Sequence, residues 1–329
     1  MGSFAGHVLP GCFFIAFGLW WWCNIMVLIA KAHARFLKSR DSRRPNIEFQ
    51  LDYETCTWLK VPVPYLRAFP LEPFLKVTAT SVGIIAELTK GDWSLINRNN
   101  HFAHLNNFAH ASMFAAFFLA ALVEILRFYS FLFLPPSAEH LLSSLAFFVV
   151  GELFYFHIDG RSVLDQNLHT FIYLLAFSIS IVFLLEAGYR KCFILFMART
   201  VLVVLLGTWF IQVAHVLYGT DPWKDTASNR AFVAIAFTWH ILALLFTILC
   251  SLLLVSLFLR ILCRSCCGTS LAADGNVTLD ATELSSLIRE NGVEDPTQID
   301  WNINTKPHTM KTLYSTLNNN ARKPYNLGG

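Results

Sequence analysis

Histidines paired with acids are the side chains of this sequence that are best suited to chemistry. The chain has 329 residues and 11 histidines. Asp165 stands four residues before His169, and Glu152 stands a turn and a half of helix before His157. Neutral imidazole is the commonest metal ligand, and a nearby carboxylate often orients it. These pairs indicate a polar site capable of binding zinc or haem or of moving protons.

The same kind of spacing recurs on other segments. Thr208, Gln212 and His215 follow i, i+4, i+7 spacing, which places them in one polar stripe of a helix. Asn106 and His110 share a face in the same way. Three further residues belong to the same set: His7, Glu87 and His240. Whether these side chains meet therefore depends on how the helices that carry them are arranged.

The apolar composition indicates that those elements are membrane helices. Hydrophobic residues make up 55% of the chain and charged residues only 14%, against roughly 25% charged residues in soluble domains. Runs of about 20 apolar residues are typical of transmembrane helices. Six such runs are evident, at about 8–30, 108–133, 140–158, 168–187, 193–217 and 231–262. A seventh segment, 71–90, is less apolar because it contains Glu72, Lys76 and Glu87.

The distribution of Lys and Arg favours seven spans. If segment 71–90 crosses the membrane, the basic stretch 31–44 lies on the same side as Arg260 and Arg264. If it does not cross, these basic residues lie on opposite sides, against the positive-inside rule. We therefore predict an all-α fold, a polytopic bundle of seven transmembrane helices over residues 1–264. The N-terminus would be lumenal or extracellular, and a polar, largely disordered cytosolic tail would follow over 265–329.

This topology gathers the histidines in one layer on the lumenal side. His240 lies deepest, about 15 Å into its span at 1.5 Å per residue. The predicted metal ligands, for an ion such as zinc, are His110, His157, His169 and His240. Zinc would lower the pKa of a bound water toward about 7, and Glu152 or Asp165 would act as general base of a membrane-embedded hydrolase. The predicted supporting polar residues are His7, Glu87, Thr208, Gln212 and His215.

The sequence resembles the transmembrane protein 45 family, a group of seven-span proteins of poorly known function. The matching motifs are residues 6–11 (GHVLPG), 83–87 (GIIAE), 110–113 (HASM, which adds Ser112 to the polar set), 152–157 (ELFYFH), 164–166 (LDQ) with His169, 199–200 (RT), 207–210 (GTWF) with Gln212, and Trp239 with His240. The resemblance covers about residues 1–262. It implies a seven-span fold in secretory or endosomal membranes and brings no reaction with it.

Alternative functions remain open at this point. Single histidines near a membrane interface also serve as hydrogen-bonded structural residues, and facing histidines would suit one haem. A third hypothesis is a non-enzymatic receptor-like binder, transporter or trafficking scaffold, with a lipid or small molecule as ligand. No inverted repeat is evident, which weakens the transporter version. The His-x-x-x-His motif of seven-span zinc hydrolases is absent. The basic stretch 31–44 favours contact with anionic lipid of the bilayer rather than with nucleic acid.

The polar tail contains short signals that operate in the cytosol. Cys263, Cys266 and Cys267 follow the last span beside Arg264, a position typical of palmitoylated cysteines. Residues 283–288 resemble an acidic-dileucine sorting signal, and residues 314–317 resemble a tyrosine-based one. The residues that define these signals for sorting adaptors are Glu283, Leu287, Ile288, Tyr314 and Leu317. They predict residence in Golgi, endosomal or plasma membranes.

Overall fold

Seven α-helices form the part of the chain that the computed structural model describes, which is residues 3–38, 69–131, 133–135 and 137–269. The helices are α1 (Phe4–Lys38), α3 (Leu71–Lys90), α4 (Leu105–Phe128), α5 (Ala138–Phe156), α6 (Val163–Gly188), α7 (Phe193–Tyr218) and α8 (Ala227–Thr269). Within these ranges the only strand-like pairing is an isolated bridge between Ile96 and Phe102. The predicted all-α fold is therefore confirmed.

Six of the helices, α1 and α4 to α8, are long and apolar enough to cross a membrane. Helix α3 differs because it contains four charged residues, which lower its hydropathy. Its 20 residues nevertheless span about 30 Å, the thickness of a bilayer's hydrocarbon core. Helix α1 extends past its predicted end at residue 30 to Lys38, because helical geometry does not stop where the apolar run stops.

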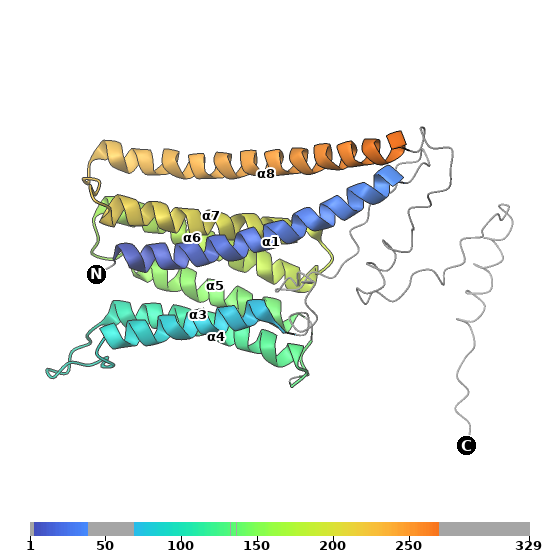
Figure 1. Cartoon of the computed structure of the whole chain (residues 1–329). Coiled ribbons are helices and arrows are strands. Elements are labelled where there is room, and N and C mark those ends of the chain that lie inside the picture. Colours follow the sequence, from blue (N-terminus) through green and yellow to red (C-terminus); the bar gives the residue numbers. More distant parts are fainter. Residues whose placement is uncertain (1–2, 39–68, 132, 136, 270–329) are drawn as a thin grey trace, which may run out of the picture. The chain divides into compact units, whose positions relative to one another are not determined.

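The helices pack in a chain of neighbours. Helix α3 lies along α4, α4 contacts α5, α5 contacts α6, and α6 contacts α7, which in turn carries α1 (Figure 1). Helix α8 lies against α1, α6 and α7. Consecutive helices run in opposite directions, so α1 begins at the end of the bundle where α8 also begins (Figure 1).

Two glycines let α1 and α7 approach to backbone contact. A Cβ placed on Gly207 would lie 2.7 Å from the carbonyl oxygen of Gly11, and one on Gly11 would lie 2.9 Å from the carbonyl oxygen of Gly207. Small residues at such crossings are common where membrane helices pack by van der Waals contact. This crossing fixes α1 on α7 near the first turns of the chain, where His7 lies.

The charges of α3 have partners on other helices. Glu72 accepts a hydrogen bond of 2.9 Å from the indole nitrogen of Trp21 on α1. Lys76 lies 3.0 Å from Glu72 and 3.0 Å from Glu124 on α4. Because buried charges need such partners in an apolar medium, α3 can remain in the bundle despite its low hydropathy.

A second buried ion pair lies between α6 and α7. The Arg199 side chain is fully buried, and its Nη1 lies 3.3 Å from Oε2 of Glu186. The guanidinium also lies over the rings of Trp21, Phe183 and Phe196 at 4.7 to 5.0 Å. These rings stabilise the cation by cation–π contact and link α1, α6 and α7.

Candidate functional site

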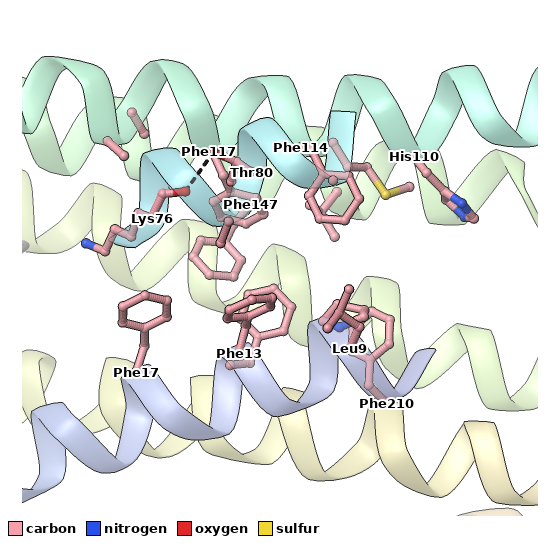
Figure 2. A pocket seen from close by; sticks show the side chains of 18 of the residues that line it. Leu9, Phe13, Phe17, Lys76, Thr80, His110, Phe114, Phe117, Phe147 and Phe210 are labelled. Carbon is pink, nitrogen blue, oxygen red and sulfur yellow. Dashed lines mark hydrogen bonds between the residues drawn. The ribbon is translucent and has the colours of Figure 1, made fainter. Parts of the chain in front are cut away.

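An apolar cavity of about 340 Å³ separates α1 from α3 and α4. Figure 2 shows α1 presenting Phe13 and Phe17 toward the side chains of α3 and α4 across this space. Phenylalanines supply much of the lining, including Phe13, Phe14, Phe17, Phe114, Phe117 and Phe147. The volume is within the range of roughly 300–1,000 Å³ that small-molecule sites occupy, and an apolar lining with few polar groups is typical of them.

Polar side chains lie at both ends of the cavity. Lys76 and Glu124, which bind each other, stand at one end, and Glu87 and His110 stand at the other. From Lys76 to Glu87, α3 rises roughly 16 Å at 1.5 Å per residue. The cavity is therefore a long, largely apolar space whose charged side chains lie at its ends.

Four imidazole rings lie in a row at one of these ends, here called the histidine end. Nε2 of His7 lies 3.4 Å from Nε2 of His169. The ring centroids of His169 and His157 are 6.0 Å apart, and those of His157 and His110 are 5.7 Å apart. The four rings come from α1, α6, the end of α5 and α4. His7 and His110 also line the cavity, which connects the row to the apolar space.

Carboxylates and one arginine hold this row in place. Oδ1 of Asp165 lies 2.6 Å from Nδ1 of His169, one turn further along α6. The other oxygen, Oδ2, accepts a hydrogen bond of 2.9 Å from Nη1 of Arg161. Arg161 also bonds Nε2 of His157 through Nη2 and the carbonyl oxygen of His157 through Nε. The two carboxylate oxygens of Asp165 thus contact one histidine and one arginine.

A second carboxylate serves the other side of the row. Oε2 of Glu87 lies 3.6 Å from Nδ1 of His110 and accepts a hydrogen bond of 2.8 Å from Nδ2 of Asn107. Lys90 lies 3.6 Å from its Oε1. The predicted i, i+4 pair of Asn106 and His110 therefore has a neighbour, Asn107, that makes the amide contact to Glu87.

His157 is held in its neutral form. It lies just beyond the end of α5, where burial lowers its pKa to about 3. The neighbouring Arg161 guanidinium acts in the same direction, and so does His169. Neutral imidazole suits the geometry here, because Nε2 must accept the hydrogen bond from Arg161.

Several predicted site residues lie away from this row. His240 is on α8, where Nδ1 lies 3.1 Å from the hydroxyl of Thr208 and the ring meets the edge of Trp209. Glu152 is exposed on α5, and His215 is exposed with its ring against Phe4.

Two of the predicted supporting residues, Ser112 and Gln212, also lie outside the row. Ser112 is exposed and donates to the carbonyl oxygen of Phe108, and Gln212 is half-buried on α7. Among the described residues, no group of three or more His, Cys, Asp or Glu side chains is placed to hold a metal ion together. The zinc, haem and general-base assignments therefore stay predictions.

Two features of the site were not predicted from the sequence. One is Arg161, which contacts both His157 and Asp165. It lies four residues after His157 and four before Asp165, so the i, i+4 rule could have predicted both contacts. The cavity has no such signal, because phenylalanines that line it are indistinguishable in sequence from those that face lipid. The side chains of Cys263, Cys266 and Cys267, and the sorting signals from Glu283 to Leu317, lie outside the described side chains.

Comparison with known proteins gives a family match of unknown function. Residues 136–254, which include α5 to α7 and much of α8, match the model of DUF716, a family of unknown function. Over 250 residues the chain is 25% identical to transmembrane epididymal protein 1A of Mus musculus, covering 74% of this chain and 77% of the relative. It is 24% identical over 250 residues to transmembrane epididymal protein 1 of Rattus norvegicus, with the same coverage.

These similarities extend over most of the helical part of the chain. The narrower resemblance to the transmembrane protein 45 family stays a prediction, because none of these matches names it. The relatives are transmembrane proteins by name, and six helices here are long and apolar enough to cross a bilayer. The chain is an integral, multi-pass membrane protein with helices in contact with lipid.

Proposed function

We propose that the protein binds a long, amphipathic molecule of the lipid class in the cavity, with the polar head at the histidine end. The observation that carries the proposal is the apolar space lined by phenylalanines between α1 and the α3–α4 pair. This is the receptor-like or carrier-like function among the alternatives that the sequence left open. The hydrolase alternative has no comparable support from the described residues.

The length of the cavity suits a single acyl chain. A bilayer's hydrocarbon core is about 30 Å thick, so the chains of one leaflet extend about 15 Å. The distance along α3 from Lys76 to Glu87, both of which line the cavity, is roughly 16 Å. A chain of the length found in ordinary membrane lipids would therefore fill the cavity from end to end.

The polar head belongs at the histidine end because side chains there can form hydrogen bonds with it. His110 is about a quarter exposed and lines the cavity beside Glu87. At the opposite end, Lys76 is already held between Glu72 and Glu124. A head group there would have to displace a buried ion pair, which is costly in an apolar medium.

The ligand can enter sideways from the bilayer. Leu9 and Phe13 line the cavity, yet they are 53% and 37% exposed. Because these α1 side chains line the cavity and are also exposed on the outer surface, the cavity opens there toward the bilayer. Ligands of the lipid class would then reach the site without passing through water.

Photolabelling tests this proposal. The full chain in membranes is incubated with a long-chain fatty acid that carries a diazirine and an alkyne, irradiated, and mapped by mass spectrometry. We expect saturable labelling on the cavity faces of α1, α3 and α4, and competition by unlabelled fatty acid. Ala79→Trp, which fills the cavity from α3, should remove most of this labelling.

Val82→Trp is the matched control. It adds the same ring to the same helix, but Val82 is 59% exposed and does not line the cavity. Labelling that is spread over the outer faces of all helices, or that is equal in the two variants, would overturn the proposal. Unlabelled fatty acid without effect on the cavity labelling would do the same.

The orientation and compartment are proposed from the charge pattern. Seven crossings, with α3 among them, would place the histidine end on the lumenal or extracellular side and the basic stretch 31–44 in the cytosol. Tail signals such as Tyr314 would direct the protein to Golgi, endosomal or plasma membranes through sorting adaptors. Epitope tags at the two termini, stained in selectively permeabilised cells, test this: only the C-terminal tag should be reached from the cytosol.

A further inference from the structure

We infer that His7 and His169 form a site for a divalent transition metal ion of the zinc class at the histidine end. The starting observation is that the two Nε2 atoms face each other at 3.4 Å between α1 and α6. Both imidazoles are buried, with 5% and 0% exposure. This ligand set differs from the one predicted from the sequence, since it includes His7 and omits His240.

The partners of the two Nδ1 atoms determine which nitrogen bears hydrogen. Nδ1 of His169 faces two acceptors, the Asp165 carboxylate at 2.6 Å and the Asp165 carbonyl oxygen at 3.0 Å. Nδ1 of His7 faces the carbonyl oxygen of Ser3 at 3.1 Å. A nitrogen that faces only acceptors must donate, so each Nδ1 carries the proton of its neutral ring. Each Nε2 is then a bare lone pair.

Two lone pairs that point at each other repel unless a cation lies between them. The distance indicates which cation fits. Hydrogen bonds of the N–H···O kind in proteins have donor–acceptor distances of about 2.7–3.2 Å. Zinc–nitrogen bonds of about 2.0–2.1 Å at a tetrahedral angle place two ligand nitrogens roughly 3.3–3.4 Å apart. The observed 3.4 Å equals the separation expected for two ligands of one metal ion and is long for a hydrogen bond.

The surroundings are those of a metal-binding histidine pair. Metal-ligating histidines usually donate the other ring N–H to a carboxylate or a backbone carbonyl. Here the backbone carbonyls of Asp165 and Ser3 accept from the two rings, and the Asp165 carboxylate lies 2.6 Å from Nδ1 of His169. Arg161 neutralises Asp165 from the side away from His169. Two imidazoles are fewer than the three protein ligands of known catalytic zinc sites, so water or the head group of a cavity ligand would complete the coordination.

Cobalt titration tests the site without any lipid probe, so its outcome is separate from that of the ligand-binding proposal. The full chain in detergent micelles is treated with a chelator and titrated with Co²⁺, which absorbs visible light when bound by nitrogen. We expect saturation at one ion per chain and displacement by Zn²⁺. His7→Ala should abolish the signal, and Asp165→Asn should weaken binding by about 10- to 100-fold.

His215→Ala is the control, because His215 lies at the same end but is exposed and outside the pair. It should bind Co²⁺ as the unaltered chain does. If His7→Ala does not fold, the thermal midpoint of the unaltered chain still tests the site. Zn²⁺ should raise this midpoint and Mg²⁺ should not. A folded chain without saturable Co²⁺ binding would overturn the metal site and leave a shared proton between the nitrogens. Equal affinity in His7→Ala would also overturn it.

Discussion

The crossing of α1 on α7 offers the sharpest test of the fold that forms the cavity. Gly207→Ala would place a Cβ 2.7 Å from the carbonyl oxygen of Gly11 and 2.8 Å from the backbone nitrogen of Ile15. Ordinary contact begins at 3.4 Å, and neither neighbour is a side chain that can rotate away. The two helices must therefore separate by several tenths of an ångström along their closest contact.

The expected loss follows from two opposing terms. Alanine in place of glycine stabilises a helix interior by about 0.8–1.0 kcal/mol. Overpacking a close contact typically costs about 1–3 kcal/mol, and a gap of 0.5–1 Å forfeits a quarter to a half of the dispersion energy of each separated atom pair. Because two of the three atoms that the new Cβ would meet are backbone atoms of α1, the upper part of that range applies. We expect a net destabilisation of about 1–2 kcal/mol.

Thermal unfolding of the full chain in detergent measures the effect. Gly207→Ala should lower the thermal midpoint by several degrees and should also reduce labelling of the cavity, since α1 forms one of its walls. Gly188→Ala is the control, because a Cβ there meets nothing within 4 Å. A Gly207→Ala midpoint equal to or above that of Gly188→Ala would refute the close crossing.

Three further predictions concern side chains between helices. Ser144 and Ser180 each donate a 2.8 Å hydrogen bond to the other's carbonyl oxygen, so either alanine variant should lose about 0.6 kcal/mol, and the double variant less than the sum. Glu186→Ala should destabilise by about 3–5 kcal/mol because Arg199 stays buried, while replacing both by apolar residues should restore part of the loss, as unfolding in detergent will show. The lowered pKa of His157 means that the unfolded chain binds its proton more readily, so stability should fall as pH drops from about 6.5 toward 3. The midpoint of His157→Gln should depend less on pH in this window, and parallel curves would contradict the assignment.

The sequence predicted the depth of residues better than their direction. Segment 71–90 was predicted as a helix, and α3 runs from Leu71 to Lys90. His240 was placed at a depth compatible with the other histidines, but it faces Thr208 on α7 instead of the row. The apolar run determines how far along a helix a residue lies, whereas the direction of its side chain depends on which neighbours that helix packs against.

Contacts within one helix could likewise be predicted from the sequence, whereas contacts between helices could not. The i, i+4 pair of Asp165 and His169 lies within one helix, and it could be predicted. The contact between His7 and His169 joins residues 162 positions apart, and no local rule brings them together. The cavity depends likewise on how α1 is placed against α3 and α4, and no local rule predicts that placement.

The ion pair between α3 and α4 has a consequence for how the chain is made. Lys76 emerges from the ribosome well before Glu124, its partner on the next helix. In the proposed arrangement of seven crossings, the four charged residues of α3 oppose its insertion as a single helix, because a charged side chain in a transmembrane helix is costly. Once α4 is synthesised, the two helices can enter the bilayer together as a hairpin with the charges already matched. Biogenesis of this protein would then proceed by helix pairs at this point rather than one span at a time.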